Sequence, residues 1–350
     1  MMATPIAAVQ ALWDPAGTYL NTASFGLPPR PAWDALQAAL DDWRTGRTSW
    51  EQWGDATEAA RGSFARLVGV PPSTVAVGAT VSGLVGLVAS SLPEGTHVLA
   101  PDVEFTSTLF PFLVQAHRGL TVRTVPAVEL AAAIDDSTDV VAFSAVQMAT
   151  GEVADLAAIV AAAKAHGALT LVDATQACGW LPLEGYGFDV LVVAGYKWLL
   201  APRGTAYMAV APERLAEVVP TAAGWFAGED VHATYFGGPL RLATDARRLD
   251  TSPAWHCWVG AAPAIALLDE VGVSAIQAHN LELANRFRAG LGLEPSDSAI
   301  VFVDVPEAAA RLERAGIRAA VRGGRVRTSW HLYNTDADVD RALEALGETL

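Results

Sequence analysis

Two short runs of apolar, largely β-branched residues constrain this chain more than any other feature. They are Leu169–Val172 and Val190–Val193, and a loop containing glycine and proline separates them. Such runs are typical of buried strands in a parallel sheet. Asp173 follows the first run directly, and Lys197 follows the second by a few residues. Because ligands of open α/β sheets bind beyond the carboxyl ends of the strands, both side chains are predicted to face one site.

The lysine content singles out one of these two residues. The chain has only two lysines, Lys164 and Lys197. Lys164 lies near the end of an alanine-rich segment, where a solvated cation that interacts with the helix dipole is expected. Lys197 lies between Tyr196 and Trp198, and apolar surroundings favour the neutral, nucleophilic amine. A lysine that lies along the sheet and extends its ammonium group into water is the alternative.

Asp173 favours the nucleophilic interpretation. Pyridoxal 5'-phosphate (PLP) needs a lysine to form a Schiff base with its aldehyde and a carboxylate to keep its pyridine nitrogen protonated. Lys197 and Asp173 supply these two groups from the ends of two predicted strands. Gln176 follows Asp173 by three residues and is a candidate hydrogen-bond donor to the phenolic oxygen of the cofactor.

The sequence VDATQ around Asp173, then GYKW around Lys197, then PRG, resembles the class V aminotransferase family of fold-type I PLP enzymes. The resemblance covers nearly the whole chain. It implies an α/β fold with a large domain, whose mainly parallel, seven-stranded sheet lies between helices, and a smaller α+β C-terminal domain. The expected division is an N-terminal arm at 1–30, the large PLP-binding domain at 31–258 and the small domain at 259–350.

A turn of small residues is the predicted phosphate site. The predicted strand 75–77 leads through Ala79 and Thr80 into a helix that begins at Val81. The start of a helix offers free backbone N–H groups and a positive dipole end to an anion. The resembling family holds its phosphate at this place. We therefore expect the Thr80 hydroxyl and the Ala79 and Val81 amides to contact the phosphate.

The resemblance implies three further contacts. Phe105 is expected to stack on the cofactor ring, with core packing as the alternative. Tyr196 can donate a hydrogen bond to the phosphate, whereas Ala79 and Ala194 lack hydroxyls that relatives often carry. Candidates for a compensating donor are Arg247, Arg248 and Ser252. In the family, the motif resembling LDTSP around Ser252 enters the active site of the neighbouring subunit, which implies a homodimer with shared sites.

The substrate residues are also inferred from the resemblance. VRTSWHLYNT is similar to a family stretch of the form R-x-S-x-x-x-YNT, which implies that Arg327 binds the substrate α-carboxylate. A surface arginine is the alternative. Asn21 in the arm, Gln147 after a predicted strand and Trp225 in a glycine-rich loop are further candidates. A connecting segment and core packing are the alternatives for Asn21 and Trp225.

These groups predict chemistry at Cα of an α-amino acid that is held as a Schiff base, with the released Lys197 amine as general base. Transamination is the first expectation, and β-elimination from a cysteine conjugate or epimerisation is the alternative. Desulfuration is less favoured because the segment before Arg327, ERAGIRAAVRGGRVR, has no cysteine. A PLP-fold protein that binds a ligand without turnover remains open, although Lys197, Asp173 and Arg327 together argue against it.

Composition excludes several other classes. With 350 residues and 52% hydrophobic content, the chain can bury a large core. A net charge of −15 argues against nucleic acid or an anionic membrane as partner. Two cysteines, no basic leader and no apolar run of membrane-spanning length favour the cytoplasm. The seven histidines form no ligand pair, so no metal site is expected.

Overall fold

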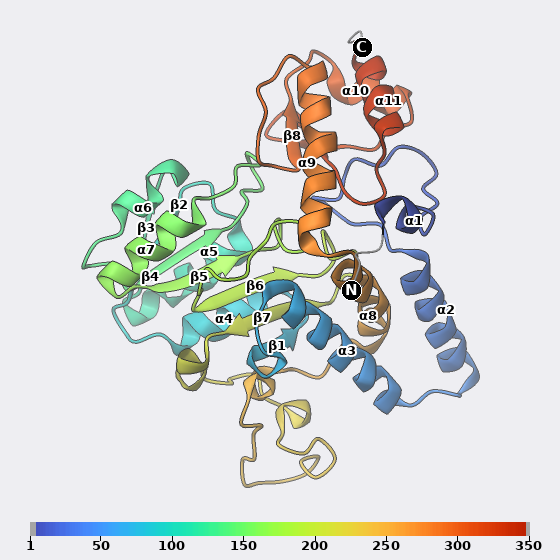
Figure 1. The fold of residues 1–350 in the computed structure, drawn as a ribbon. Coiled ribbons are helices and arrows are strands. Elements are labelled where there is room, and N and C mark those ends of the chain that lie inside the picture. Colours follow the sequence, from blue (N-terminus) through green and yellow to red (C-terminus); the bar gives the residue numbers. More distant parts are fainter. Residues whose placement is uncertain (1–4, 348–350) are drawn as a thin grey trace.

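The computed structural model describes residues 5–347, so the ends of the predicted arm and of the predicted small domain lie outside the described residues. A seven-stranded sheet in the order β1-β7-β6-β5-β4-β2-β3 forms its centre (Figure 1). Strands β6, β5, β4, β2 and β3 run parallel, whereas β7 runs antiparallel to both of its neighbours. The strands are β1 (Val75–Gly78), β2 (His97–Pro101), β3 (Thr121–Val125), β4 (Val140–Ser144), β5 (Leu169–Asp173), β6 (Val190–Ala194) and β7 (Ala206–Val210). The predicted mainly parallel sheet is confirmed.

Helices cover both faces of this sheet. Successive side chains of a strand point to opposite faces. On β4, Val140 and Ala142 belong to the core under α4 (Val81–Ser91). Val141 and Phe143 belong to the core under α7 (Leu156–His166). Two-sided burial is the reason that these strands have continuous apolar sequences instead of alternating ones.

The strand register brings four chain segments to one edge of the sheet. Asp173 ends β5, opposite Ser144 on β4 and Val192 on β6. The segment that carries Lys197 follows the end of β6. Strand β1, which runs in the same direction as β6, ends at Gly78 and leads into α4. The polar groups that follow these strands therefore meet at this edge.

A second, antiparallel sheet lies beside the first, in the order β8-β10-β9 (Figure 1). Its core contains Phe287, Trp330 and Leu343 and also encloses Leu20 from the N-terminal segment. The Leu20 backbone hydrogen-bonds to those of Arg318 and Ser329, so the segment is fixed to this sheet. The elements are β8 (Ile300–Val303), β9 (Ala320–Arg322), β10 (Arg325–Ser329), α9 (Val273–Gly290), α10 (Ala308–Arg314) and α11 (Asp336–Leu346).

The remaining helices complete the description. They are α1 (Ile6–Gln10), α2 (Arg30–Thr45), α3 (Trp50–Val68), α5 (Thr106–Leu113), α6 (Leu130–Ala133) and α8 (Trp255–Val271). The expected division at residues 258 and 259 falls within α8, and the domain limits stay a prediction. Between residues 5 and 347, no single helix has the length and hydropathy of a membrane span, and α8 with α9 meets these criteria only as a pair bent by 84°.

Candidate active site

Lys197 lies in the turn after β6 and is 6% exposed. Its Nζ lies 5.5 Å from the centre of the Phe105 ring and 5.8 Å from that of Tyr196. In the described part of the chain, no carboxylate lies within ion-pair distance of it. Burial, the largest cause, lowers the pKa of Lys197 to about 8, against the opposing effect of the Asp173 carboxylate. The neutral fraction of this amine near physiological pH is therefore much larger than that of an ordinary lysine, although the protonated form still predominates.

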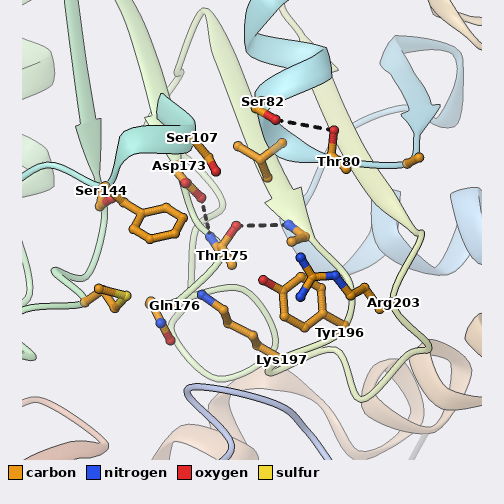
Figure 2. A pocket seen from close by; sticks show the side chains of 15 residues that line it. Thr80, Ser82, Ser107, Ser144, Asp173, Thr175, Gln176, Tyr196, Lys197 and Arg203 are labelled. Carbon is orange, nitrogen blue, oxygen red and sulfur yellow. Dashed lines mark hydrogen bonds between the residues drawn. The ribbon is translucent and has the colours of Figure 1, made fainter. Parts of the chain in front are cut away.

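Asp173 is held in a fixed orientation at the end of β5. Its carboxylate accepts hydrogen bonds from Thr108 Oγ1 at 3.0 Å and from the Thr175 amide at 2.8 Å. The side chain is buried, yet it lines the same pocket as Lys197 (Figure 2). A carboxylate has about four acceptor positions, so these two bonds orient it and leave capacity for a donor in the pocket.

The N-terminus of α4 forms one end of this pocket (Figure 2). Thr80 is the N-cap and accepts a hydrogen bond from the Gly83 amide at 3.2 Å. Ala79 and Val81 also line the pocket, as predicted for an anion site. The hydroxyls of Ser82 and Ser107 also line the pocket, and the sequence analysis did not predict them. They lie in the first turns of α4 and α5. The predicted helix starts could have identified them, because the first turn of a helix has free backbone amides.

Gln176 also lines the pocket, and its amide has a set orientation. Its Nε2 donates to the Ala23 carbonyl at 2.9 Å, and its Oε1 accepts from the Trp198 indole at 2.8 Å. The indole can only donate, which fixes the oxygen and nitrogen assignment of the amide. One amide hydrogen remains for a further acceptor. Gln176 therefore also ties the N-terminal segment to the turn that carries Lys197.

Phe105 and Gln147 have different surroundings. Phe105 lines the pocket and is 36% exposed. Gln147 is not among the pocket-lining residues, because its Nε2 donates to the buried Glu104 carboxylate at 3.0 Å. Glu104 also accepts from the Phe105 and Ser144 amides, at 2.8 and 2.7 Å. Burial raises the pKa of Glu104, and its donors oppose that shift. Sequence reasoning missed this buried carboxyl, which holds the start of α5 against the end of β4.

Arg327 is a buried guanidinium on β10, only 1% exposed. Its Nη2 donates to Ser24 Oγ at 2.9 Å and its Nη1 to the Met148 carbonyl at 3.3 Å, while its Nε has no partner. No carboxylate within residues 5–347 forms an ion pair with it. Burial, the largest cause, and the Arg322 charge lower the pKa of Arg327 to about 10. A buried cation of this kind needs an anion from elsewhere.

Besides Gln147 and Arg327, three further predicted residues lie outside the pocket lining in this chain. Asn21 lies beside β10 as a backbone bridge partner of Ser329, and its buried Oδ1 has no hydrogen-bond partner. Trp225 packs edge-to-face on Trp50, with ring centres 5.0 Å apart. Ser252 is exposed in the segment between β7 and α8. Their roles, like those of the other site residues, stay predictions.

Comparison with solved structures identifies the fold. The structure superimposes on that of the C-DES protein with glycine covalently linked to its PLP cofactor, with a TM-score of 0.86, 22% identity and coverage of 98% of this chain and 99% of that chain. The cystine C–S lyase C-DES in complex with cysteine persulfide gives a TM-score of 0.84 at 23% identity, over 95% of this chain and 97% of that one. The fold is that of the fold-type I PLP-dependent enzymes.

Sequence comparison defines the family. The family model for class V aminotransferases matches residues 43–311. An uncharacterized aminotransferase of Bacillus subtilis is 30% identical over 356 residues, which cover 94% of this chain and 93% of the relative. Isopenicillin N epimerase of Streptomyces clavuligerus is 31% identical over 390 residues, at 96% and 95% coverage. The chain belongs to the class V aminotransferase family of PLP-dependent enzymes.

The pocket residues fit this cofactor. A buried amine without a hydrogen-bond partner, a carboxylate with spare acceptor capacity and a helix N-terminus line one pocket. These groups match the aldehyde, the pyridine nitrogen and the phosphate of PLP, respectively.

The lowered pKa of Lys197 predicts how stability depends on pH. An unfolded lysine has a pKa of about 10.4, so between pH about 8 and about 10 the unfolded chain binds more protons at this position. The free energy of unfolding of the cofactor-free protein should therefore rise with pH, by up to about 1.4 kcal/mol per unit from this residue. Urea unfolding of the unaltered protein and of the Lys197→Met variant, at pH 7 to 10, measures the difference. Parallel pH profiles for the two proteins would contradict the burial argument.

Proposed function

We propose that this protein is an aminotransferase that acts on an α-amino acid. The observation that supports this best is the buried, partner-free Lys197 amine in one pocket with Asp173, close to the unpaired guanidinium of Arg327. PLP supplies an electron sink for the electrons left when a bond to Cα breaks. In this proposal Lys197, Arg327 and Asp173 select and orient an amino acid that has both an amine and an α-carboxylate.

Each pocket residue then has a chemical task. Lys197 would hold the cofactor aldehyde and would supply the base that accepts the proton from Cα. Asp173, held by Thr108 and Thr175, keeps the pyridine nitrogen protonated. The free amides at the start of α4, with Thr80, bind the phosphate. Phe105 is assigned to the face of the cofactor ring. Gln176 is assigned to the phenolic oxygen, and Tyr196 to the phosphate, each as a hydrogen-bond donor.

The number of bases favours transamination over epimerisation. Transamination moves one proton between two carbons on the same side of the ring, for which a single amine suffices. Epimerisation by two bases needs a second proton carrier on the opposite side. Among the described pocket-lining residues, Lys197 is the only amine, neither histidine nor cysteine occurs, and the phenol of Tyr196 is assigned to the phosphate. The side chain assigned to the ring face, Phe105, carries no titratable group.

The absence of a cysteine among those residues also makes persulfide formation unsupported. Cys178 is fully buried, and burial raises its pKa. Cys257 Sγ donates to the Arg203 carbonyl at 3.0 Å, and burial raises the pKa of this thiol too. Both cysteines are free thiols, which supports a reducing compartment such as the cytoplasm.

The first test removes the amine. A Lys197→Ala variant should lose the imine absorption band at roughly 410–430 nm, because no Schiff base can form. Its turnover of amino acids with a keto-acid acceptor should fall on the order of 10²–10⁴-fold, the usual contribution of a positioned base. Absorbance spectra and a panel of amino acids, assayed for keto acid and for pyridoxamine phosphate, measure both effects.

Lys164→Met is the matched control, because it removes the only other lysine and should retain the band and the activity. Borohydride reduction of the unaltered protein should label the peptide of Lys197 and not that of Lys164. Release of ammonia or thiol without pyridoxamine phosphate would show that the reaction is β-elimination and not transamination. Racemised amino acid would show that it is epimerisation. A spectral shift without any product would mean a binding protein.

The second test concerns Arg327. An Arg327→Met variant should bind α-amino acids about 10- to 150-fold more weakly, since a charge-assisted hydrogen bond contributes about 1.5–3 kcal/mol. The matching amines without a carboxylate should bind the variant and the unaltered protein equally well. Spectral titration of the holoenzyme measures both affinities. Arg325→Met, on the same strand but exposed, is the control, and equal losses for amino acids and amines would contradict the assignment.

We also propose that the protein is a homodimer whose subunits share the two active sites. The segment between β7 and α8 extends away from the sheet (yellow, Figure 1) and carries two large apolar side chains, Phe236 and Leu240, that are 88% and 81% exposed. Ser252 lies further along this segment, outside the pocket of its own chain. A second copy would cover these side chains and bring Ser252 toward its pocket.

The Phe236→Glu and Leu240→Glu double variant should therefore be monomeric and less active, because two charges would be buried without partners at the interface. Analytical ultracentrifugation of the holoenzyme measures the mass. Val128→Glu is the control, since Val128 is 85% exposed in the short helical turn Ala127–Glu129, outside the segment between β7 and α8. A monomeric unaltered protein, or a dimeric double variant, would contradict this interface.

A further inference from the structure

Arg203 lines the pocket but has no partner for its charge. It lies in the loop between β6 and β7, and its guanidinium carbon is 4.8 Å from the centre of the Tyr196 ring (Figure 2). No side chain or backbone oxygen of residues 5–347 accepts a hydrogen bond from this guanidinium. Arg61, Arg66, Arg214 and Arg286 form ion pairs with carboxylates, whereas Arg203 is exposed at the pocket, where an added anion can reach it.

The backbone of this loop is fixed, so the position of Arg203 is not accidental. The Arg203 carbonyl accepts from Cys257 Sγ on α8 at 3.0 Å. Gly204 follows with φ +111°, and a Cβ at that residue would lie 2.9 Å from the same sulfur. Only glycine allows both the close approach and the positive φ. The loop therefore holds Arg203 at the pocket, six residues after Lys197.

The end of the pocket near α4 supplies neutral donors but no cationic side chain for an anion with two charges. Ala79 and Ala194 line it without hydroxyl groups. Thr80 Oγ1 accepts from the Gly83 amide, so its hydroxyl proton stays available, and Ser82 and Ser107 add two further neutral hydroxyl groups. The start of a helix carries only about half a positive charge. These groups leave most of the charge of a phosphate uncompensated.

We propose that Arg203 is the cationic ligand of the cofactor phosphate, and that it closes the anion site opposite the N-terminus of α4. A guanidinium presents two parallel N–H groups that match two phosphate oxygens. The Tyr196 ring, against which it stacks, orients the plane of the guanidinium and also carries a phenol that donates to the same anion. Because Arg203 and Lys197 belong to one loop, the phosphate and the aldehyde of a single molecule are held by the same short segment.

The other candidates for this role face elsewhere in the same chain. Arg247 Nη2 donates to the Gly228 carbonyl at 2.9 Å, and Arg247 lines a different hollow of the surface, beside Trp50. Arg248 and Ser252 are not among the residues that line the pocket with Lys197. Arg203 is therefore the arginine that the fold directs at the phosphate end.

A comparison of two ligands isolates the phosphate contact. The cofactor-free full-length protein is titrated with PLP and with pyridoxal, which has the aldehyde but no phosphate, and the imine absorbance gives each affinity. Arg203→Met should weaken PLP binding about 10- to 150-fold and change pyridoxal binding less than about 2-fold. Inorganic phosphate should strengthen pyridoxal binding to the unaltered protein and not to this variant. Arg203→Lys, which keeps the charge but not the paired N–H groups, should lie in between.

Arg322→Met is the matched control, because the Arg322 charge also lowers the pKa of Lys197 but Arg322 does not line the pocket. It should leave the ratio of PLP to pyridoxal affinity unchanged. An equal loss for both ligands in Arg203→Met, or no loss for PLP, overturns the proposal. Should Arg203→Met not fold, an unchanged ratio in Arg203→Lys overturns it as well. The imine band of either ligand reports on Lys197 independently, so a failed phosphate contact remains distinct from a failed proposed function.

Discussion

The parallel pairing of β5 with β6 is the constraint on which the pocket depends. It sets Asp173 opposite Val192, so that the carboxylate and the turn carrying Lys197 leave the sheet side by side. A slip of one residue would turn the Asp173 side chain to the other face of the sheet. Beyond the strand ends the contact continues, because Thr175 Oγ1 accepts from the Ala194 amide. The two strand ends therefore behave as one rigid support for the reacting groups.

The N-terminal segment joins this support to the smaller sheet. The Ala23 carbonyl accepts from Gln176 at the large sheet, while Ser24 Oγ accepts from Arg327 on β10. The Gly26 amide donates to the Tyr196 carbonyl at 2.9 Å, and a Cβ at Gly26 would lie 2.1 Å from the Lys197 carbonyl. Residues 23–26 together thus contact both the segment carrying Lys197 and the guanidinium of Arg327. This segment therefore links the smaller sheet directly to the residues around the pocket.

The sequence permitted a prediction of the sheet and of the central pair, because apolar runs and the polar residues that end them are local patterns. Asp173 and Lys197 follow from that pattern alone. The contact of Gln147 with Glu104 could not be predicted in this way. The two residues are distant in the chain, and only the packing of β4 against α5 brings them together. The PRG motif contains Arg203, but the sequence does not show whether this arginine has a carboxylate partner, because that depends on tertiary contacts. Sequence patterns give the type and order of elements, and the fold decides which polar groups remain unpaired.

Unpaired cations account for the expected selectivity of the pocket. The chain has a net charge of −15, but Lys197 and Arg203 line the pocket, and Arg327 lies beside it through its contact with the Met148 carbonyl. Within residues 5–347 none of the three has a carboxylate in ion-pair distance. Lys197 and Arg327 are buried, whereas Arg203 is exposed at the pocket. A buried cation without an ion-pair partner costs free energy in the protein alone, and a ligand that brings an anion removes that cost. A ligand that lacks the anion leaves the cost in place, which is a strong form of discrimination. In the proposed function, the pocket therefore gains specificity for a carboxylate-bearing amine at the expense of stability when empty.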